Sequence, residues 1–549
     1  MWTAVPRPEG KHIVSCKRVW RIKTREDGSI ERYKARLVAC GFTQARGVDY
    51  NETFAPVTRL DTLQLLIAHT VQHDWEFRQI DVKTAYLYRE LEEEVYMAVP
   101  EDLGGVPEGY VLKLNMALYG LKQAGRQWYL RLKDVMKKFG MELIPSDPHT
   151  FIARKKVNSE LKTIIIPIYV DDLFPFSDKE LVDDFKREIP AFFETSPPCD
   201  AHYLLGIRIT RNHNPEHVPP YICLDQINFI EKVLDAISST FNEQITTQRT
   251  VLPHTPIEPN PKPTNLMDLA FVHSFQSAVG QLMYLMLATR PDIAYPVGML
   301  ARHASNPNTN HLEALLHLAG YSGNTIDMVI TFRKPIDAID PGTIQGYSDA
   351  NWAGEEHSGR STSGMVVIKN DSPICWGSKR QGVVSRSTTE SEYIAMFTVG
   401  NHLTWLSTLE TQLKFEASYA PELFCDNQAT IAIANSDENI QFKRSKFINV
   451  KYHWVCDERK RGTFSVHWVE TKNNVADPFT KCLAHGPLKK LWKEFMEPYS
   501  MLEVWDNEGS DEEVSGRSVE QLAPFVSLFC FFFCLVYLDS TSTTAVPIL

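Results

Sequence analysis

Apolar and polar positions follow one another in blocks along this chain, and one block carries an unusual interruption. Residues 164–174 read IIIPIYVDDLF, a β-branched apolar run that stops at Asp171 and Asp172 and then resumes. Because β-branched residues favour strands, the run predicts a buried strand pair with the two acids at its turn. A divalent cation with oxygen ligands would relieve the repulsion between adjacent anions. An Asp-Asp pair is also ordinary solvated turn chemistry, so the couplet alone leaves both interpretations open.

A second apolar stretch supplies a third acid. Residues 77–87 read FRQIDVKTAYL, a strand-like run in which Asp81 lies among apolar neighbours. Taken alone, Asp81 would be an ordinary acid at the end of a strand. Together with the couplet 90 residues later, it has the composition of a three-carboxylate site on adjacent antiparallel strands.

The pattern changes near residue 344, where short strands begin to alternate with helices. A short strand within residues 346–353 (GYSDANWA) is expected to end at Asp349. Further strands are predicted at 363–369 and 373–378, where apolar residues dominate. This alternation predicts a mixed α/β unit that ends near residue 485.

A long helix follows these strands, and one of its acids faces inward. The helix is predicted to start near Thr388 and Thr389, which are good capping residues. Glu392 shares a face with the apolar positions 395, 396, 399, 403 and 406, so its side chain is expected to face the core or a site. Glu390 lies on a helix face that becomes polar further along, so it is the second choice for the inward-facing acid.

Two more acids complete a series of four. Asp426 ends the strand-like run 422–425, and Asp477 lies near a helix start, with Pro478 suited to the first turn. Each acid alone would be read as a surface charge or a cap. Four of them, in order within about 130 residues on alternating strands and helices, favour a shared site instead. His467 lies on a predicted strand, and we assign it no role.

Length and composition predict a multidomain protein with conventional cores. The chain has 549 residues, of which 43% are hydrophobic and 23% charged, which suggests about three or four domains. Its ten cysteines form no CxxC pair, which favours a reducing compartment and argues against a zinc ribbon. A secretory signal pattern is not found at the start, so secretion is not expected.

The net charge of −11 is unevenly distributed. Residues 1–60 hold 12 Lys and Arg against six Asp and Glu, whereas residues 491–520 hold two against nine. The basic front would suit a phosphate backbone, and a solvated surface is the equally open alternative.

Composition shifts divide the chain into five segments. The first unit covers residues 1–255, and a Pro-rich linker covers 256–270. A helical segment (271–343) and the strand–helix unit (344–485) follow. Residues 486–549 are predicted to form an acidic, disordered tail that includes the apolar segment 522–538. We favour a read-through origin for that segment and keep a tail anchor as the alternative, because it is shorter than a typical membrane span.

The motifs resemble one protein family. IDVKTAYL, ALYGLKQAGRQWY and YVDD occur in this order and resemble the reverse transcriptase of copia-type long-terminal-repeat retrotransposons. The match runs from about Trp2 to about residue 255. YSDANWAG, STTESEY, CDNQA and VADPFTK resemble the RNase H of the same family. The resemblance implies an α+β and α/β multidomain fold: right-hand-like fingers and palm, a helical connection and an RNase H-like mixed-sheet domain.

The resemblance also implies roles for single residues. Catalytic and metal-binding roles fall on Asp81, Asp171 and Asp172 for the polymerase, and on Asp349, Glu392, Asp426 and Asp477 for the nuclease. Each site would take two Mg²⁺ or Mn²⁺ ions. Lys34 and Arg36 would grip the incoming triphosphate, Tyr86 would exclude a 2′-hydroxyl, and Gln123 would lie near nucleotide and template. For Tyr86, a plain core aromatic is the alternative.

The implied function is an RNA-directed DNA polymerase with RNase H activity. Its partners would be an RNA template, a DNA primer, the RNA–DNA hybrid and deoxynucleoside triphosphates, in the cytoplasm or in virus-like particles. Because upstream modules are not found, we expect a piece of a larger polyprotein. The alternative is a silent relic that at most binds nucleic acid, since Pro167 and Pro175 interrupt the hairpin. A membrane-anchored protein rests only on residues 522–538. The sequence predicts no oligomeric state.

Overall fold

The computed structural model describes most of the chain up to residue 499. It leaves out residues 25–29, 198, 213–219, 254–256, 261–268, 335–341, 356, 416–418, 437–448, most of 484–495 and everything from 500 onward. The acidic run and the apolar segment 522–538 therefore lie outside the described residues. Among the helices that are described, none has the length and apolar character needed to cross a membrane.

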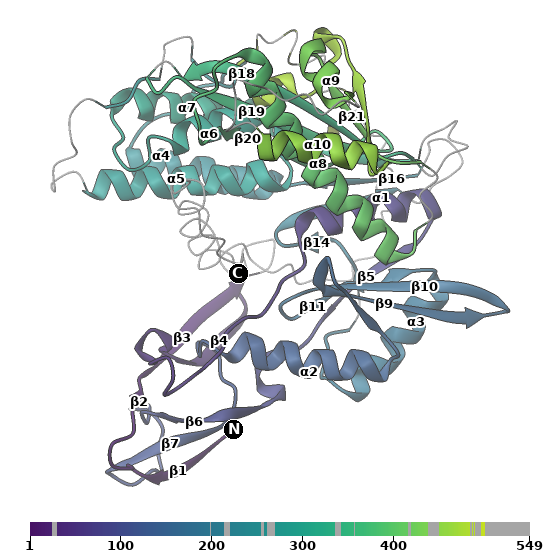
Figure 1. The fold of residues 1–549 in the computed structure, drawn as a ribbon. Helices are drawn as coiled ribbons and strands as arrows, with labels where there is room; N and C mark the ends of the chain where they lie inside the picture. The colour runs from purple at the N-terminus through teal and green to yellow at the C-terminus, as the bar shows by residue number, and fades with distance from the viewer. Residues whose placement is uncertain are drawn as a thin grey trace.

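A mixed four-stranded sheet and a two-stranded antiparallel ribbon form the amino-terminal end of the molecule (Figure 1). The fingers sheet has the order β1-β7-β6-β2, and the fingers ribbon pairs β3 with β4. Val14, Val95 and Leu112 form part of a small apolar core beneath the sheet. The elements are β1 (Trp2–Pro6), β2 (Ile13–Val14), β3 (Cys16–Thr24), β4 (Ile30–Ala39), β6 (Glu90–Met97) and β7 (Tyr110–Met116).

The palm sheet follows, with the strand order β11-β5-β12-β10-β9-β8 and β13 paired to β5. Helices α2 and α3 cover it through a core that includes Trp128, Leu132, Ile166 and Phe185. The elements are α1 (Leu60–His73), β5 (Glu76–Asp81), α2 (Ala124–Lys138), β8 (Glu142–Ile144), β9 (Asp147–Val157), β10 (Glu160–Tyr169), β11 (Asp172–Leu173), β12 (Phe176–Ser177), α3 (Lys179–Glu188) and β13 (Cys199–Asp200).

The strand predicted over residues 77–87 is shorter than expected. Pairing of β5 ends at Asp81, and Ala85–Tyr88 form a 3-10 helix instead. Thr84 has a φ of 53°, a left-handed conformation that turns the chain away from the sheet. Tyr86 therefore sits on a helical turn at the edge of the palm sheet and not in a strand.

The two prolines leave the predicted hairpin in register. Ile168 pairs with Leu173, and Ile165 pairs with Phe176, so no residue is inserted on either side of Pro167 or Pro175. The chain keeps one ladder bond here, from the Phe174 amide to the Pro167 carbonyl at 3.1 Å. The second strand is interrupted at Phe174 and Pro175, between β11 and β12, but both parts pair with β10 in one register.

The middle of the chain follows the predicted segments in part, because three of the described helices fall largely within residues 271–343, the segment predicted as helical. The connection sheet has the order β14-β15-β16-β17-β23 and joins strands from both sides of residue 255. The segment predicted as helical contains the buried strand β17, because its apolar run MVITF pairs with β16. β23 lies within the predicted tail, and α5 begins inside the predicted linker. The elements are β14 (Tyr203–Leu204), β15 (Ile207–Asn212), β16 (Tyr221–Asp225), α4 (Ile227–Phe241), α5 (Leu269–Ala288), α6 (Ala294–Ala301), α7 (Thr309–Asn324), β17 (Met328–Arg333) and β23 (Met496–Pro498).

The last unit is a mixed sheet with helices against it. The nuclease sheet has the order β20-β19-β18-β21-β22, with β18, β21 and β22 parallel to one another. The predicted strands at 363–369 and 373–378 are confirmed. The elements are β18 (Gln345–Glu355), β19 (Arg360–Lys369), β20 (Ser372–Arg380), α8 (Thr388–Leu413), β21 (Glu422–Cys425), α9 (Gln428–Ala434), α10 (Asn449–Lys460) and β22 (Ser465–Trp468).

Two local predictions in this unit need correction. Ser387, and not Thr388 or Thr389, caps α8, because its hydroxyl accepts the Glu390 amide at 3.2 Å. Asp349 lies inside β18 and not at its end, since the strand continues to Glu355 through an irregular pairing. The predicted fold class is confirmed: fingers and palm, a connection and an RNase H-like mixed sheet.

Candidate active sites

Folding brings Asp81 to the acidic couplet. β5 pairs antiparallel with β11, which places Asp172 directly opposite Asp81. The Val82 amide donates to the Asp171 carbonyl at 2.8 Å, so the backbone of the turn is tied to β5 as well. Directly opposed residues on adjacent strands have neighbouring side chains. The first predicted site is therefore assembled in space, although the roles of its acids remain predictions.

The turn that carries Asp171 is stabilised by a hydrogen bond from helix α2. Val170 adopts a φ of 56°, a conformation that a β-branched residue rarely takes. Its carbonyl accepts the indole N–H of Trp128 at 2.5 Å, and the Trp128 ring is buried in the palm core. The α2 helix thereby fixes the shape of the turn.

The three acids have different surroundings. Asp172 is buried, and one of its carboxylate oxygens accepts the Gln79 side-chain amide at 3.1 Å. Asp81 and Asp171 are only half-buried, and the Ser196 hydroxyl donates to Asp81 at a long 3.4 Å. Asp172 is thus the most buried of the three acids.

Aromatic and basic side chains extend from the couplet toward the fingers ribbon. Burial, followed by the nearby charge of Asp171, raises the pKa of the Tyr86 hydroxyl. The Tyr86 ring packs edge-on against Tyr119 at 4.7 Å, and the Arg36 guanidinium lies 4.6 Å from the Tyr119 ring centre. Lys34 is two residues from Arg36 on β4, so both lie on one face of the ribbon.

Tyr119 was missed from the sequence. It lies in the same motif as Gln123, and only its spatial position between Arg36 and Tyr86 marks it. An aromatic residue in a loop carries no periodic signal, so the sequence offered little reason to single it out.

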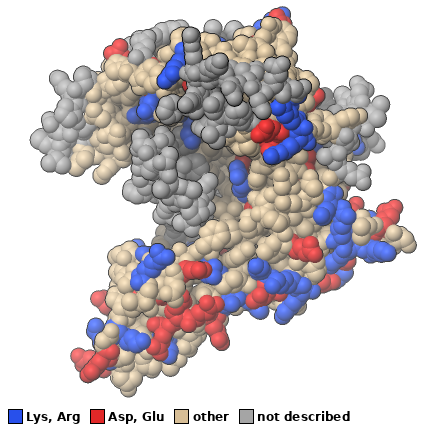
Figure 2. Space-filling model, viewed as in Figure 1, with Lys and Arg blue, Asp and Glu red and all other residues tan. Residues whose placement is uncertain are grey.

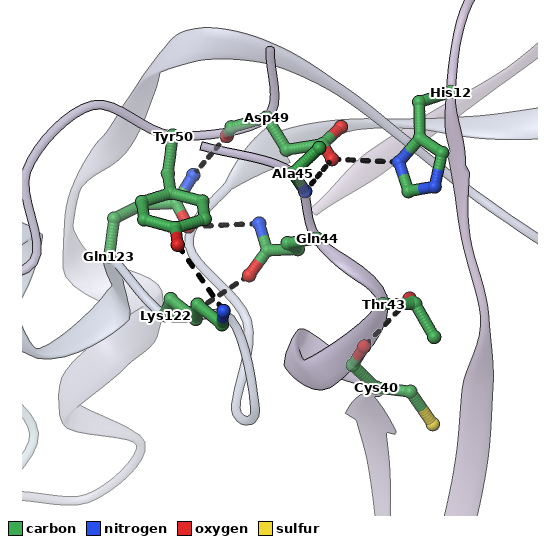
Figure 3. A network of polar contacts seen from close by, with 9 residues as sticks. All are labelled: His12, Cys40, Thr43, Gln44, Ala45, Asp49, Tyr50, Lys122 and Gln123. Carbon is green, nitrogen blue, oxygen red and sulfur yellow. Dashed lines mark hydrogen bonds and ion pairs between the residues drawn. The ribbon is translucent and has the colours of Figure 1, made fainter. Parts of the chain in front are cut away.

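Gln123 is held inside the protein by its own hydrogen bonds. It is fully buried, and its amide nitrogen donates to the Asp49 carbonyl at 2.8 Å (Figure 3). Its amide oxygen accepts the Gln44 side chain at 3.1 Å, and Gln44 in turn accepts the Lys122 backbone amide at 2.8 Å. Both ends of the Gln123 amide are thus engaged within the protein. Gln123 therefore holds the loop in place, and its position near nucleotide and template stays a prediction.

The basic front is partly neutralised by acids. Lys11 pairs with Glu94 at 3.1 Å, and Arg18 pairs with Asp102. Figure 2 shows acidic and basic side chains mixed over this end of the molecule. The excess of positive charge in residues 1–60 therefore does not form one continuous basic surface on this face.

The nuclease acids come from four separate elements. Asp349 lies on β18, Glu392 on α8, Asp426 directly after β21, and Asp477 at the start of a 3-10 helix (Asp477–Phe479). The charges of Asp477 and Asp426 act on Asp349, and those of Asp349 and Asp426 act on Glu392. All four predicted residues are therefore neighbours in the fold.

Burial dominates the electrostatics of this cluster. It raises the pKa of Asp349 to about 6, with added repulsion from Asp477 and Asp426. Burial also raises the pKa of Glu392 to about 9, with repulsion from Asp349 and Asp426. Part of the charge is balanced, because Lys481 pairs with Asp477 and the Thr480 hydroxyl donates to Asp349.

A glycine lets the last acid approach the sheet. Gly364 pairs with Asp349 across β18 and β19. A Cβ atom on Gly364 would lie 2.8 Å from the Ala476 carbonyl oxygen and 2.9 Å from the Phe479 Cβ. The segment that carries Asp477 can pack here only because position 364 has no side chain.

The structure also separates the two glutamates at the start of α8. Glu390 is partly exposed and accepts the Arg386 amide at 2.7 Å, as a residue of the helix cap would. Glu392 is buried, and its carboxylate accepts the Cys425 thiol at 3.9 Å. This contact supports Glu392 over Glu390. His467 is exposed on β22 and bonds to Ser465 at 2.7 Å.

Both clusters consist of groups that suit hard cations. Glu392, Cys425 and Asp426 offer ligand atoms that lie within 4.8 Å of one another. The carboxylates of both sites are the ligands that Mg²⁺ and Mn²⁺ prefer. Because burial raises the pKa of Asp349 and Glu392, a cation bound beside them would favour their ionised forms.

Comparisons with known proteins agree with this arrangement. Residues 1–250 match a family described as reverse transcriptase (RNA-dependent DNA polymerase). The chain is 34% identical over 501 residues to the retrovirus-related Pol polyprotein from transposon TNT 1-94 of Nicotiana tabacum, covering 90% of this chain and 36% of that protein. It is 34% identical over 493 residues to the polyprotein from transposon RE1 of Arabidopsis thaliana, covering 88% and 32%. The chain thus spans about a third of the length of these relatives.

Two solved structures are similar at low score. One is a foamy viral protease-reverse transcriptase in complex with dsDNA, at 14% identity and a TM-score of 0.20, covering 85% of this chain and 77% of that one. The other is RNase H1 from Halobacterium salinarum NRC-1, at 16% identity and a TM-score of 0.19, covering 25% and 95%. With TM-scores this low, neither likeness bears on the position of any residue.

Proposed function

Because this chain belongs to the Pol polyproteins of copia-type retrotransposons, with a reverse transcriptase unit in residues 1–250, we propose that it is an RNA-directed DNA polymerase that also cleaves the RNA strand of an RNA–DNA hybrid. The observation that carries the proposal is the presence of two separate carboxylate clusters, one in the palm and one in the nuclease unit. Its substrates are an RNA template, a DNA primer and deoxynucleoside triphosphates.

In the polymerase, the residues divide into a metal-holding group and a nucleotide-holding group. Asp81 and Asp171 hold two Mg²⁺ or Mn²⁺ ions, with Asp172 beside them. When bound, the ions neutralise phosphate charge and stabilise the attacking and leaving oxygens. Lys34 and Arg36 bind the triphosphate, for which the forked guanidinium is well suited.

Tyr86 is proposed to select the sugar. Its ring is fixed by Tyr119 at 4.7 Å and lies near Asp171, where the sugar of an incoming nucleotide would approach the metal site. A fixed flat ring in that place leaves no room for a 2′-hydroxyl and so favours deoxynucleotides. A ring that packs closely against Tyr119 has little freedom to move aside.

In the nuclease, the four acids hold the second pair of ions. Asp349, Glu392, Asp426 and Asp477 supply oxygen ligands, and Lys481 balances the charge of Asp477. Discrimination against DNA comes from contacts to the 2′-hydroxyl of the RNA strand. The alternative of a silent relic loses one of its motives, because the prolines leave the hairpin in register.

Purified protein tests the proposal directly. With Mg²⁺ or Mn²⁺, it should extend oligo(dT) on poly(rA), and Asp171→Asn should not. It should also cut a labelled RNA–DNA hybrid, and Asp426→Asn should not. Extension no greater than that of Asp171→Asn would reject the polymerase, and equal cleavage by wild type and Asp426→Asn would reject the nuclease.

A further inference from the structure

A buried ionic cluster joins the palm and nuclease units. The Glu410 carboxylate on α8 lies 2.9 Å from the Lys369 ammonium at the end of β19 and 3.1 Å from His69 Nε2 on α1. All three residues are less than 5% exposed. α1 packs between the palm strand β12 on one hand and the strands β17 and β20 on the other, whereas β19 and α8 belong to the nuclease unit. Charged groups are rarely buried this deeply unless they are paired.

Neighbouring contacts extend the same joint. The Phe415 ring stacks on His69 with centres 3.6 Å apart. The Trp405 indole donates to the Ser146 carbonyl at 3.2 Å, and the Ser146 amide donates to the Gln412 side chain at 2.9 Å. Ser146 lies between the palm strands β8 and β9. The carboxyl-terminal third of α8 is therefore bonded directly to the palm.

The same helix carries a nuclease acid at its other end. Figure 1 shows α8 running from the nuclease sheet toward the palm. Glu392 and Glu410 are 18 residues apart on one uninterrupted helix, which is about 27 Å at 1.5 Å per residue. Because the helix is continuous, the position of its carboxyl-terminal end determines the position of its amino-terminal end. Docking at Glu410 thus fixes where Glu392 stands relative to the palm.

We propose that Glu410, Lys369 and His69 are positioning residues that hold the nuclease acids at a fixed spacing from the polymerase acids. This inference rests on the proposed function. A single duplex that occupies both sites would then be cut at a constant distance behind the primer terminus. Loss of Glu410 leaves Lys369 buried without its carboxylate, so the joint should loosen while each site keeps its own residues.

The position of cleavage tests this inference, because mere stability would not change it. On a primed RNA template, the full-length wild-type chain should place its first cuts at one preferred distance from the primer terminus. In Glu410→Gln, the share of cuts at that distance should fall at least about threefold, the scale of changes along coupled contacts. Extension of a primer on DNA and cleavage of an unprimed hybrid should stay near wild type.

A matched variant controls for the loss of a buried glutamate. Glu458 on α10 is also buried, and its carboxylate bonds to Arg461 at 2.6 Å and Thr463 at 2.7 Å within the nuclease unit. Glu458→Gln should leave the spacing of cuts unchanged. Trp405→Phe, which removes the bond to Ser146 and shrinks the ring that faces the Arg59 guanidinium at 4.1 Å, is the milder second variant if Glu410→Gln does not fold.

The outcomes separate this inference from the proposed function. A wild-type chain without either activity would reject the proposed function. Active Glu410→Gln and Trp405→Phe proteins that keep the wild-type spacing would overturn the inference and leave the function standing. Equal broadening in Glu458→Gln would also overturn it, because the spacing would then not depend on the joint.

Discussion

The polymerase and nuclease acids are built in contrasting environments. Asp81 and Asp171 are only partly buried, at the end of a strand pair and in a two-residue turn. Asp349 and Glu392 are buried under a helix and a closing 3-10 turn, where burial raises the pKa of both. An open hairpin admits a bulky duplex end, whereas a buried cluster concentrates charge that needs cations or donors nearby. The nuclease should therefore depend more strongly on its supporting contacts.

The joint between the two regions should be sensitive to acid. Burial lowers the pKa of His69 to about 4, against partial compensation by Glu410, and Lys369 and His73 lower it further. The folded pKa lies below the unfolded value of about 6.5. Neutral His69 therefore contributes fully to the free energy of unfolding above pH 6.5. This free energy decreases by about 3 kcal/mol as the pH falls toward 4.

Hydrogen exchange of α1 measures this loss. After correction for the intrinsic effect of pH, protection of residues 60–73 should fall between pH 6.5 and 4.5 in wild type. His69→Phe keeps the ring stack on Phe415 and removes the titrating group, so its protection should change less over the same range. An identical pH profile in both proteins would show that His69 does not govern the joint.

Removing one donor from each site sharpens the contrast further. Thr480→Val deletes the hydroxyl that donates to buried Asp349, and cleavage should fall about tenfold, as for other supporting contacts of metal ligands. Ser196→Ala deletes a 3.4 Å bond to partly buried Asp81, and extension should change by less than about twofold. Steady-state rates of RNA cleavage and DNA extension measure these two effects. Similar losses of activity in the two variants would contradict the claim that the buried nuclease acids depend more strongly on supporting contacts.

Local periodicity predicted much of this arrangement. The apolar face of α8 identified Glu392 over Glu390, and the β-branched run before the couplet gave the hairpin. Such patterns report which side of an element is buried. Pairings between distant segments are decided by packing. The place of β23 beside β17, the buried amide of Gln123 and the role of Tyr119 between Arg36 and Tyr86 all depend on them. None of these leaves a local pattern.

The central claim is that each cluster of acids carries its own reaction on one chain. The most direct test follows DNA extension and RNA cleavage together on one primed RNA template, with Mg²⁺, in wild type, Asp81→Asn and Asp349→Asn. Loss of a metal ligand should reduce the matching activity by about 1000-fold or more. The other activity should stay within about twofold, because the sites are distant. If either substitution abolished both activities, or left both intact, the account would be contradicted.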